Sequence, residues 1–226
     1  MPPGEAKQTT RISPISLVEQ AVELLHQRIV DGVLPAGSRL VIDQLAREFG
    51  ISLVPIREAL ARLHAEKLVE HSPNRGYRVA QRLSSVDIRK LFEAREVLEA
   101  GTIDLVVRNV DDALIKALRR MNKAISSCKT GQTFAQFQEF VELNDEFHAA
   151  ILAAGGNTML LDAYKGLSYG PLVARELFGR GVPDLKNIVQ EHEAIISNLE
   201  RRDRRGAKRA IRDHIADGFR RFESDH

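Results

Sequence analysis

From Ser16 onward, apolar residues recur every three to four positions, which is the spacing of a helix with one buried face. This first helix ends at the turn signal Asp31-Gly32. A Pro/Gly turn and a short apolar segment follow. The pattern then predicts two more helices: a short one over Asp43–Phe49, with Asp43 as its N-cap, and a longer one over 52–66.

A change of pattern follows these helices. The segment LVEHSPNRGYRV (68–79) predicts two short strands joined by a Pro-Asn-Arg-Gly turn, a small β-hairpin. Gly50 lies between the last two helices and suits the left-handed conformation of a helix end. Residues 1–15 are polar and rich in Pro, Thr and Ser, and are predicted to form a flexible tail. Residues 16–81 are therefore expected to form a first domain.

Residues 82–226 show helical periodicity throughout and no convincing strand alternation. The expected helices lie near 84–108, 111–127, 133–154, 157–178, 184–200 and 206–223. The predicted fold is therefore mainly α: an N-terminal winged helix-turn-helix with a small β-hairpin, followed by a C-terminal antiparallel all-α helical bundle.

Composition adds limits on class and location. Hydrophobic residues make up 43% of the chain and charged residues 28%, as is usual for globular proteins. The single cysteine, Cys128, excludes an intrachain disulfide. No apolar run approaches ~18 residues, and the first residues lack the apolar core of a secretory signal, so a cytoplasmic protein with no membrane partner is expected. The net charge of +2 does not by itself indicate a nucleic-acid partner, so any DNA-contacting residues must be placed locally.

The predicted order is a helix, a tight turn with glycine, a second helix and a hairpin. This is the order of a winged helix-turn-helix, whose second helix enters the major groove of double-stranded DNA. Arg57 near the start of that helix is the main candidate for a base contact, because arginine bonds guanine through two parallel hydrogen bonds. Arg62 is placed to reach phosphate. For any one arginine the alternative is an ordinary solvated charge. The residues expected to contact DNA are Arg39, Ser52, Leu53, Arg57, Arg62, Asn74, Arg75 and Gly76.

These residues carry a resemblance. The stretch 33–79 resembles the DNA-binding domain of GntR-family bacterial transcription regulators. The matching positions are Pro55, Arg57, Glu58, Ala59, Leu60, Asn74, Arg75 and Gly76. The chain departs from the family pattern at Leu53, where the family has arginine, at Val54, where it has threonine, and at Lys67, where it has glycine. Because that arginine usually reads DNA, we expect a different operator or a greater dependence on Arg57; the change at Lys67 is expected to be harmless.

Polar side chains interrupt the apolar stripes of the predicted bundle. Asn144 and His148 are one turn apart in one helix, and His192 and His214 each lie within a later stripe. His192 and His214 are 11 residues before and after Asp203, so an antiparallel helical hairpin would bring them level. Three imidazoles and one amide oxygen suit a divalent metal ion, zinc first, with nickel or manganese as alternatives. Each histidine alone is also compatible with a hydrogen-bonded core residue.

A second resemblance covers this bundle. The segments AREVLEAG (94–101), NDEFHAAILAAGGN (144–157) and EHEAIISNLERRDRRGAKRAIRDH (191–214) resemble the C-terminal ligand-binding domain of the FadR subfamily, called FCD. The resemblance implies a metal held by Asn144, His148, His192 and His214. Asn144 stands where aspartate is commoner and brings no charge, so Asp145 is an alternative ligand.

Arg95 is the other polar residue on an apolar face. Glu99, one turn later, is one partner for it. The resemblance suggests instead that Arg95 faces the pocket and helps to hold an acidic effector, a small organic carboxylate.

Together these features favour a ligand-responsive transcription regulator, and the resemblance implies a homodimer on a pseudo-palindromic operator. Residues 82–226 would bind the effector and dimerise. A metal-dependent enzyme that uses the three-histidine site, with the winged helix as an interaction module, is the alternative, but no catalytic motif such as His-Glu-x-x-His is present. A partner-binding protein is the third hypothesis. The basic run 201–212 is interpreted as a solvated face, and Cys128 is not expected to be a nucleophile.

Overall fold

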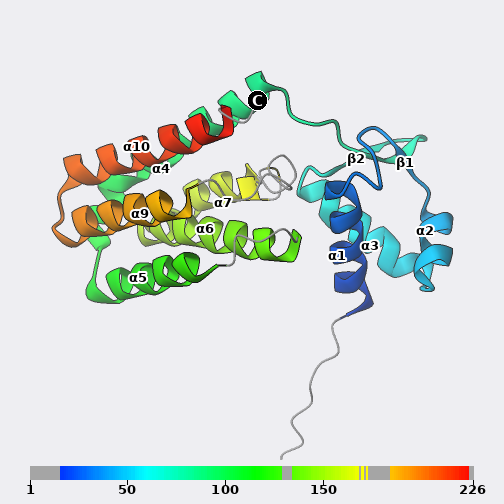
Figure 1. Cartoon of the computed structure of the whole chain (residues 1–226), viewed down its shortest axis with the longest axis horizontal. Coiled ribbons are helices and arrows are strands. Elements are labelled where there is room, and N and C mark those ends of the chain that lie inside the picture. Colours follow the sequence, from blue (N-terminus) through cyan, green and yellow to red (C-terminus); the bar gives the residue numbers. More distant parts are fainter. Residues whose placement is uncertain (1–15, 129–133, 168, 171, 173–183, 224–226) are drawn as a thin grey trace, which may run out of the picture.

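A computed structural model describes residues 16–128, 134–167, 169–170, 172 and 184–223. The predicted tail (1–15) and the predicted helix breaks at 129–131 and 179–183 lie outside these residues. In Figure 1 the chain forms two parts next to each other, a small part with three helices and a sheet, and a larger part made of helices.

The small part contains the three predicted helices and the hairpin. Its elements are α1 (Leu17–Val30), β1 (Arg39–Leu40), α2 (Ile42–Phe49), α3 (Leu53–Ala65), β2 (Val69–Ser72) and β3 (Gly76–Val79). Two details differ from the sequence expectation. The apolar segment before α2 is a short strand, and the sheet has the antiparallel order β1-β3-β2. The N-cap of α2 is Val41 rather than Asp43, which lies in the first turn, where its charge favours the positive end of the helix dipole.

The small part has its own apolar core, because α1 packs on α3 and the sheet closes the side of α3 near its end. Its fully buried side chains include Leu25, Ile56, Leu60, Leu63 and Leu68. Since Ile56 and Leu60 hold one face of α3 inward, the opposite face of α3 is directed to solvent.

Among the described residues of the larger part, the regular elements are all helices. Its elements are α4 (Ser85–Asn109), α5 (Asp112–Ser127), α6 (Phe134–Ala154), α7 (Thr158–Gly166), α9 (Leu185–Glu200) and α10 (Arg204–Glu223). The helix predicted over 157–178 is interrupted: α7 ends at Gly166, with Leu167 as its C-cap. No helix in the described part of the chain is long and apolar enough to cross a membrane.

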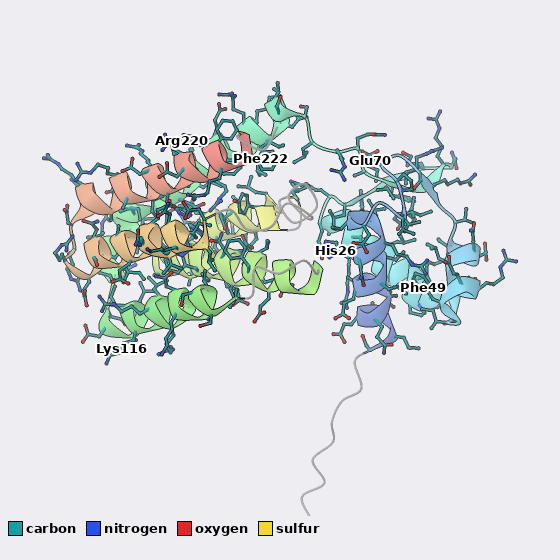
Figure 2. The ribbon with its side chains drawn as sticks, in the orientation of Figure 1. His26, Phe49, Glu70, Lys116, Arg220 and Phe222 are labelled. Carbon is teal, nitrogen blue, oxygen red and sulfur yellow. The ribbon has the colours of Figure 1, made fainter. Side chains whose placement is uncertain are left out.

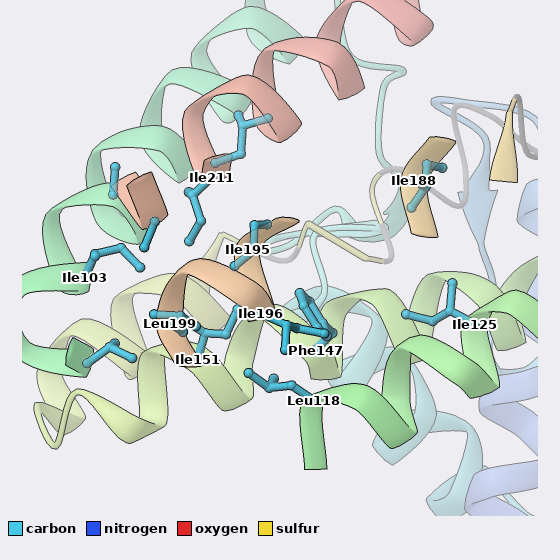
Figure 3. Close-up of a cluster of buried hydrophobic side chains, with 14 of the residues drawn as sticks. Ile103, Leu118, Ile125, Phe147, Ile151, Ile188, Ile195, Ile196, Leu199 and Ile211 are labelled. Atoms are coloured by element: carbon cyan, nitrogen blue, oxygen red, sulfur yellow. The ribbon is translucent and has the colours of Figure 1, made fainter. Parts of the chain in front are cut away.

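Packing in the larger part places α10 against α4 and α9, and α5 against α6 and α9. Figure 3 shows the apolar side chains that meet between these helices. They include Ile103, Leu118, Ile125, Phe147, Ile195, Ile196 and Leu199, all fully buried. This core surrounds the polar residues that the sequence placed on apolar stripes.

Lys67 joins the two parts. It follows α3 in the left-handed conformation, with φ 61°, and the backbone bonds around it form a Schellman helix end. Its Nζ donates a hydrogen bond to the carbonyl oxygen of Gly166, at the end of α7, over 2.7 Å. The lysine that replaces the family's glycine is therefore an interdomain contact, which the sequence alone did not indicate. His26 of α1, labelled in Figure 2, is buried in the small part, and burial lowers its pKa to about 4.

A stability prediction follows from the start of α4. Ser84 and Asp87 form a capping box, in which each side chain accepts a bond from the other's backbone N–H. Replacing Ser84 with alanine should lower the free energy of unfolding by about 1 kcal/mol, because one N–H of the first turn loses its partner. Chemical denaturation would measure it. Ser85→Ala, at the exposed neighbouring position, is the matched control and should change stability by a few tenths of a kcal/mol at most; equal losses in both variants would contradict the capping role.

Candidate functional site

Three histidines from three helices meet in the core of the larger part. His148 lies on α6, His192 on α9 and His214 on α10, and one ring nitrogen from each lies within 4.8 Å of the others. All three are buried. The rings of His192 and His214 are 4.8 Å apart between centroids, level across the antiparallel α9–α10 pair on either side of Asp203.

The Nδ1 atom of each histidine faces an acceptor. His148 Nδ1 is 2.7 Å from Glu99 Oε2, His192 Nδ1 is 3.2 Å from the Asn122 amide oxygen, and His214 Nδ1 is 2.7 Å from Glu191 Oε2. The hydrogen bonds at His192 and His214 hold the proton on Nδ1 and leave the lone pair on Nε2, while His148 Nδ1 lies close to Glu99 Oε2 without hydrogen-bond geometry. Phe147 stacks on the His192 ring at 4.1 Å and fixes its orientation.

The Nε2 atoms point toward one another. His148 Nε2 and His214 Nε2 are 3.1 Å apart, and His192 Nε2 is buried without a hydrogen-bond partner. Two imidazole nitrogens bound to one tetrahedral zinc ion are about 3.3 Å apart. The Nε2 atom of His192 is buried without a partner and lies close to the Nε2 atoms of His148 and His214. These three nitrogens form a donor set that fits a divalent metal ion.

Protonation favours the same chemistry. Burial lowers the pKa of His192 well below its ordinary value, and the neighbouring charged groups lower it further. Burial also lowers the pKa of His214 to about 4, although Glu191 opposes the shift. Both rings are therefore neutral at pH 7, the form in which imidazole binds metals.

The oxygen ligand is less defined than the nitrogens. Asn144 lies one turn before His148 on α6 and is buried. Asp145, the alternative, is outside the histidine cluster and accepts a hydrogen bond from the Tyr164 hydroxyl on α7 over 2.7 Å. Of the two, Asn144 is the buried one, while Asp145 is half-buried and engaged by Tyr164.

Arg95 pairs with Glu99, one turn later on α4. Its Nε donates to Glu99 Oε1 over 2.7 Å, and both side chains are almost completely buried. The guanidinium carbon lies 3.7 Å from the centre of the Tyr169 ring. Its Nη2 is buried and has no hydrogen-bond partner. Burial alone would raise the pKa of Glu99, but Arg95 and His148 outweigh burial and lower it.

Sequence reasoning missed two of the acceptors. Asn122 interrupts the buried stripe of α5 between Leu118 and Ile125, so the signal used for the histidines would have found it. Glu191 gave no such signal, because it precedes His192 and its two oxygens are shared between His214 and Arg221 of α10. Only the packing of α9 on α10 shows that role.

The candidate DNA contacts all lie on the small part. Arg39 is on β1, and Arg57 and Arg62 are on α3; all three side chains are exposed. Ser52 is the N-cap of α3, and its side chain makes no capping bond. Leu53 and Val54 begin the helix and are 37% and 60% exposed.

The hairpin tip carries the remaining candidates. Asn74 and Gly76 have φ values of 65° and 73°, the left-handed conformation that a tight turn requires. Arg75 between them is exposed, and its N–H donates to the Ser72 carbonyl. The tip therefore presents Asn74 and Arg75 to solvent.

The structure also describes the basic run 201–212 and Cys128, which the sequence analysis left without a functional role. Within the run 201–212, Lys208 pairs with Asp104 over 2.8 Å and Arg212 with Glu96 over 3.2 Å, which joins α10 to α4. Cys128 is buried, and burial raises the pKa of its thiol.

Comparison with known families and proteins gives consistent matches. Residues 17–79 match the gntR family of bacterial regulatory proteins, and residues 90–217 match the FCD domain family. The chain is 27% identical over 195 residues to YdhC of Bacillus subtilis, described as an uncharacterised HTH-type transcriptional regulator, covering 84% of each protein. It is 27% identical over 185 residues to the gluconate operon transcriptional repressor of Bacillus licheniformis, covering 80% of this chain and 74% of that protein.

A solved structure shares the fold. McbR/YncC of Escherichia coli superposes with a TM-score of 0.70 at 18% sequence identity, covering 94% of this chain and 99% of that one. The mainly helical architecture with a small sheet after the helix-turn-helix is therefore that of solved regulator structures.

A stability prediction tests the buried ion pair. Arg95→Met should lower the free energy of unfolding of the metal-free protein by about 3–5 kcal/mol, because Glu99 is left as a buried charge without its main partner. Arg212→Met breaks the exposed pair with Glu96 and should cost less than about 1 kcal/mol. Denaturant unfolding of both variants would measure the difference; similar losses would show that the Arg95–Glu99 pair is not the stronger constraint.

Proposed function

The chain belongs to the GntR family of bacterial regulatory proteins and carries an FCD domain, so it is a transcriptional regulator and not an enzyme. We propose the following mechanism for it. Residues 16–81 form the DNA-binding domain, and residues 82–226 form the effector-binding and dimerisation domain. The protein acts in the cytoplasm as a homodimer of the FadR subfamily.

DNA recognition is assigned to α3 and the hairpin. The first turns of α3 enter the major groove, where Arg57 contacts a guanine, and Arg62 reaches a phosphate. Arg75 at the hairpin tip and Arg39 on β1 contact the backbone or the adjacent minor groove, with Asn74 and Gly76 shaping the turn. Ser52 is available to a phosphate because its hydroxyl makes no capping bond. Two such domains in a dimer require two half-sites, so the operator is pseudo-palindromic.

The bundle is proposed to hold a divalent metal ion, zinc first and nickel or manganese as alternatives. The observation that carries this proposal is the buried His192 Nε2, which lacks a partner and faces two other imidazole nitrogens. His148, His192 and His214 would bind the ion, with Asn144 as an oxygen ligand. When bound, the ion would provide a positive centre for an oxygen of the effector.

The effector is proposed to be a small organic carboxylate. Arg95 Nη2 is a buried donor without a partner in the helical core, and a carboxylate oxygen is the acceptor that a guanidinium binds best. The repressor from Bacillus licheniformis is named for the gluconate operon, and gluconate is a carboxylate, which agrees with this class.

Effector binding is proposed to change DNA affinity by shifting the placement of the two DNA-binding domains. Lys67 supports this route, because it follows α3 directly and bonds the end of α7. α7 in turn contacts α6 through the Tyr164–Asp145 hydrogen bond, one residue from Asn144.

Arg57→Ala should remove specific DNA binding. In a gel-shift titration against the DNA upstream of the protein's own gene, we expect salt-sensitive, sequence-specific binding by the wild-type chain, and a loss of about 5-fold or more in the variant, because a bidentate arginine–guanine contact contributes about 1–3 kcal/mol.

Arg120→Ala, at an exposed position on α5, is the matched control and should bind as the wild type does. Equal binding by the Arg57 variant would contradict its role. Absence of specific binding by the wild-type chain at two salt concentrations, with zinc present, would contradict the regulator mechanism.

Metal affinity should follow the histidine geometry. Zinc binding measured by chelator competition should fall by two orders of magnitude or more in His192→Ala, and by about 10–100-fold in Glu99→Gln, which replaces one of the two carboxylate oxygens by an NH2 group and removes the negative charge beside His148. Asn144→Asp should strengthen zinc binding, because it adds a charged oxygen ligand.

His71→Ala removes an exposed histidine of the small part and is the control, with unchanged zinc affinity expected. Stoichiometric zinc binding that survives His192→Ala would place the metal elsewhere. Unchanged affinity in Asn144→Asp would remove Asn144 from the ligand set.

A further inference from the structure

The start of α3 presents an unusual surface for a helix that reads DNA. Leu53 and Val54 are its first two residues, and they are 37% and 60% exposed. Single exposed apolar side chains are common on protein surfaces, but these two are adjacent at the end of the helix that the proposed function places in the major groove. The core holds one face of α3 through the fully buried Ile56 and Leu60, so Leu53, three residues before Ile56, lies at the edge of that face, and Val54 lies farther from it.

Leu53, Val54 and Arg57 lie on one side of α3. Arg57 is four residues after Leu53 and three after Val54, and residues at these separations are neighbours on a helix surface. The exposed end of α3 therefore combines two apolar side chains with one guanidinium.

The major groove offers a partner for each group. Guanine presents two acceptors to arginine, and thymine presents its C5 methyl group to apolar side chains. No other base carries an apolar group on that edge. Leu53 and Val54 have no hydrogen-bonding atoms in their side chains, so contact with a methyl group is the one base-specific interaction open to them.

We propose that Leu53 and Val54 are specificity-determining residues that read thymine methyl groups beside the guanine bound by Arg57. This inference rests on the proposed function of α3 as the DNA-reading helix. The helix rises about 6 Å from Leu53 to Arg57, and neighbouring base pairs are about 3.4 Å apart. The thymines therefore lie within about two base-pair steps of that guanine in each half-site.

Replacing thymine by uracil tests the contact, because it removes the methyl group and leaves the Watson–Crick pairing unchanged. An operator is first selected from a random DNA pool with the wild-type chain and zinc. Each thymine of the half-site is then replaced singly by deoxyuridine, and the Kd is measured by fluorescence anisotropy. Loss of one buried methyl group should weaken binding about fourfold at one or two thymines close to the guanine.

Variants assign the effect to the residues. In the double variant Leu53→Ala/Val54→Ala, binding to the selected operator should weaken, and the difference between thymine and uracil at those positions should disappear. Val97→Ala, which shortens a valine that is 75% exposed on α4, is the matched control and should keep the wild-type difference. The wild-type measurement needs no substitution in the protein, so it stays decisive if the double variant folds poorly.

The outcomes separate the two proposals. A selected operator that the wild-type chain binds equally well with thymine or uracil would overturn the methyl contact and leave the regulator mechanism standing. An equal uracil effect in the double variant would also overturn it. A pool that yields no selected sequence would contradict both proposals.

Discussion

The burial of Arg95, Glu99 and His148 in one continuous set of polar contacts constrains the larger part of the structure. Each of these side chains is at most 1% exposed, and removing an ion such as the Arg95 guanidinium or the Glu99 carboxylate from water costs several kcal/mol unless it finds a partner. Glu99 is a partner for both neighbours, because one of its carboxylate oxygens faces Arg95 and the other faces His148. Because Glu99 is on α4 and His148 is on α6, these two helices must keep a fixed register.

The same constraint prepares the histidine cluster. With Nδ1 of each ring facing an acceptor, the three rings have little freedom to rotate, and their Nε2 atoms converge in a place that water does not reach. The acceptors come from α4, α5 and α9, so the arrangement depends on nearly the whole bundle. The side chains of such a site are ordered when the protein folds. Binding of an ion or an acid would therefore not have to order them again.

The DNA-binding part is built differently. It has its own apolar core, and the exposed side chains of α3 take no part in that core. The buried face of α3 fixes the direction of the helix, while Leu53, Val54 and Arg57 are available to a partner. Lys67 contributes one of the contacts between the parts, and its left-handed conformation is uncommon for a residue other than glycine. Lys67 therefore connects the end of α3 to the end of α7.

Local sequence rules determined most of the secondary structure and the candidate residues, because helical periodicity, capping residues and glycine turns act over a few positions. They placed the histidines on buried stripes and predicted that His192 and His214 would be level. They missed β1, since a two-residue strand exists only through its pairing with β3, and they extended α7 beyond Gly166. Tertiary packing alone decided which acceptor faces each imidazole, that Arg95 keeps a free donor, and that Lys67 meets α7, because those contacts join residues far apart in the chain.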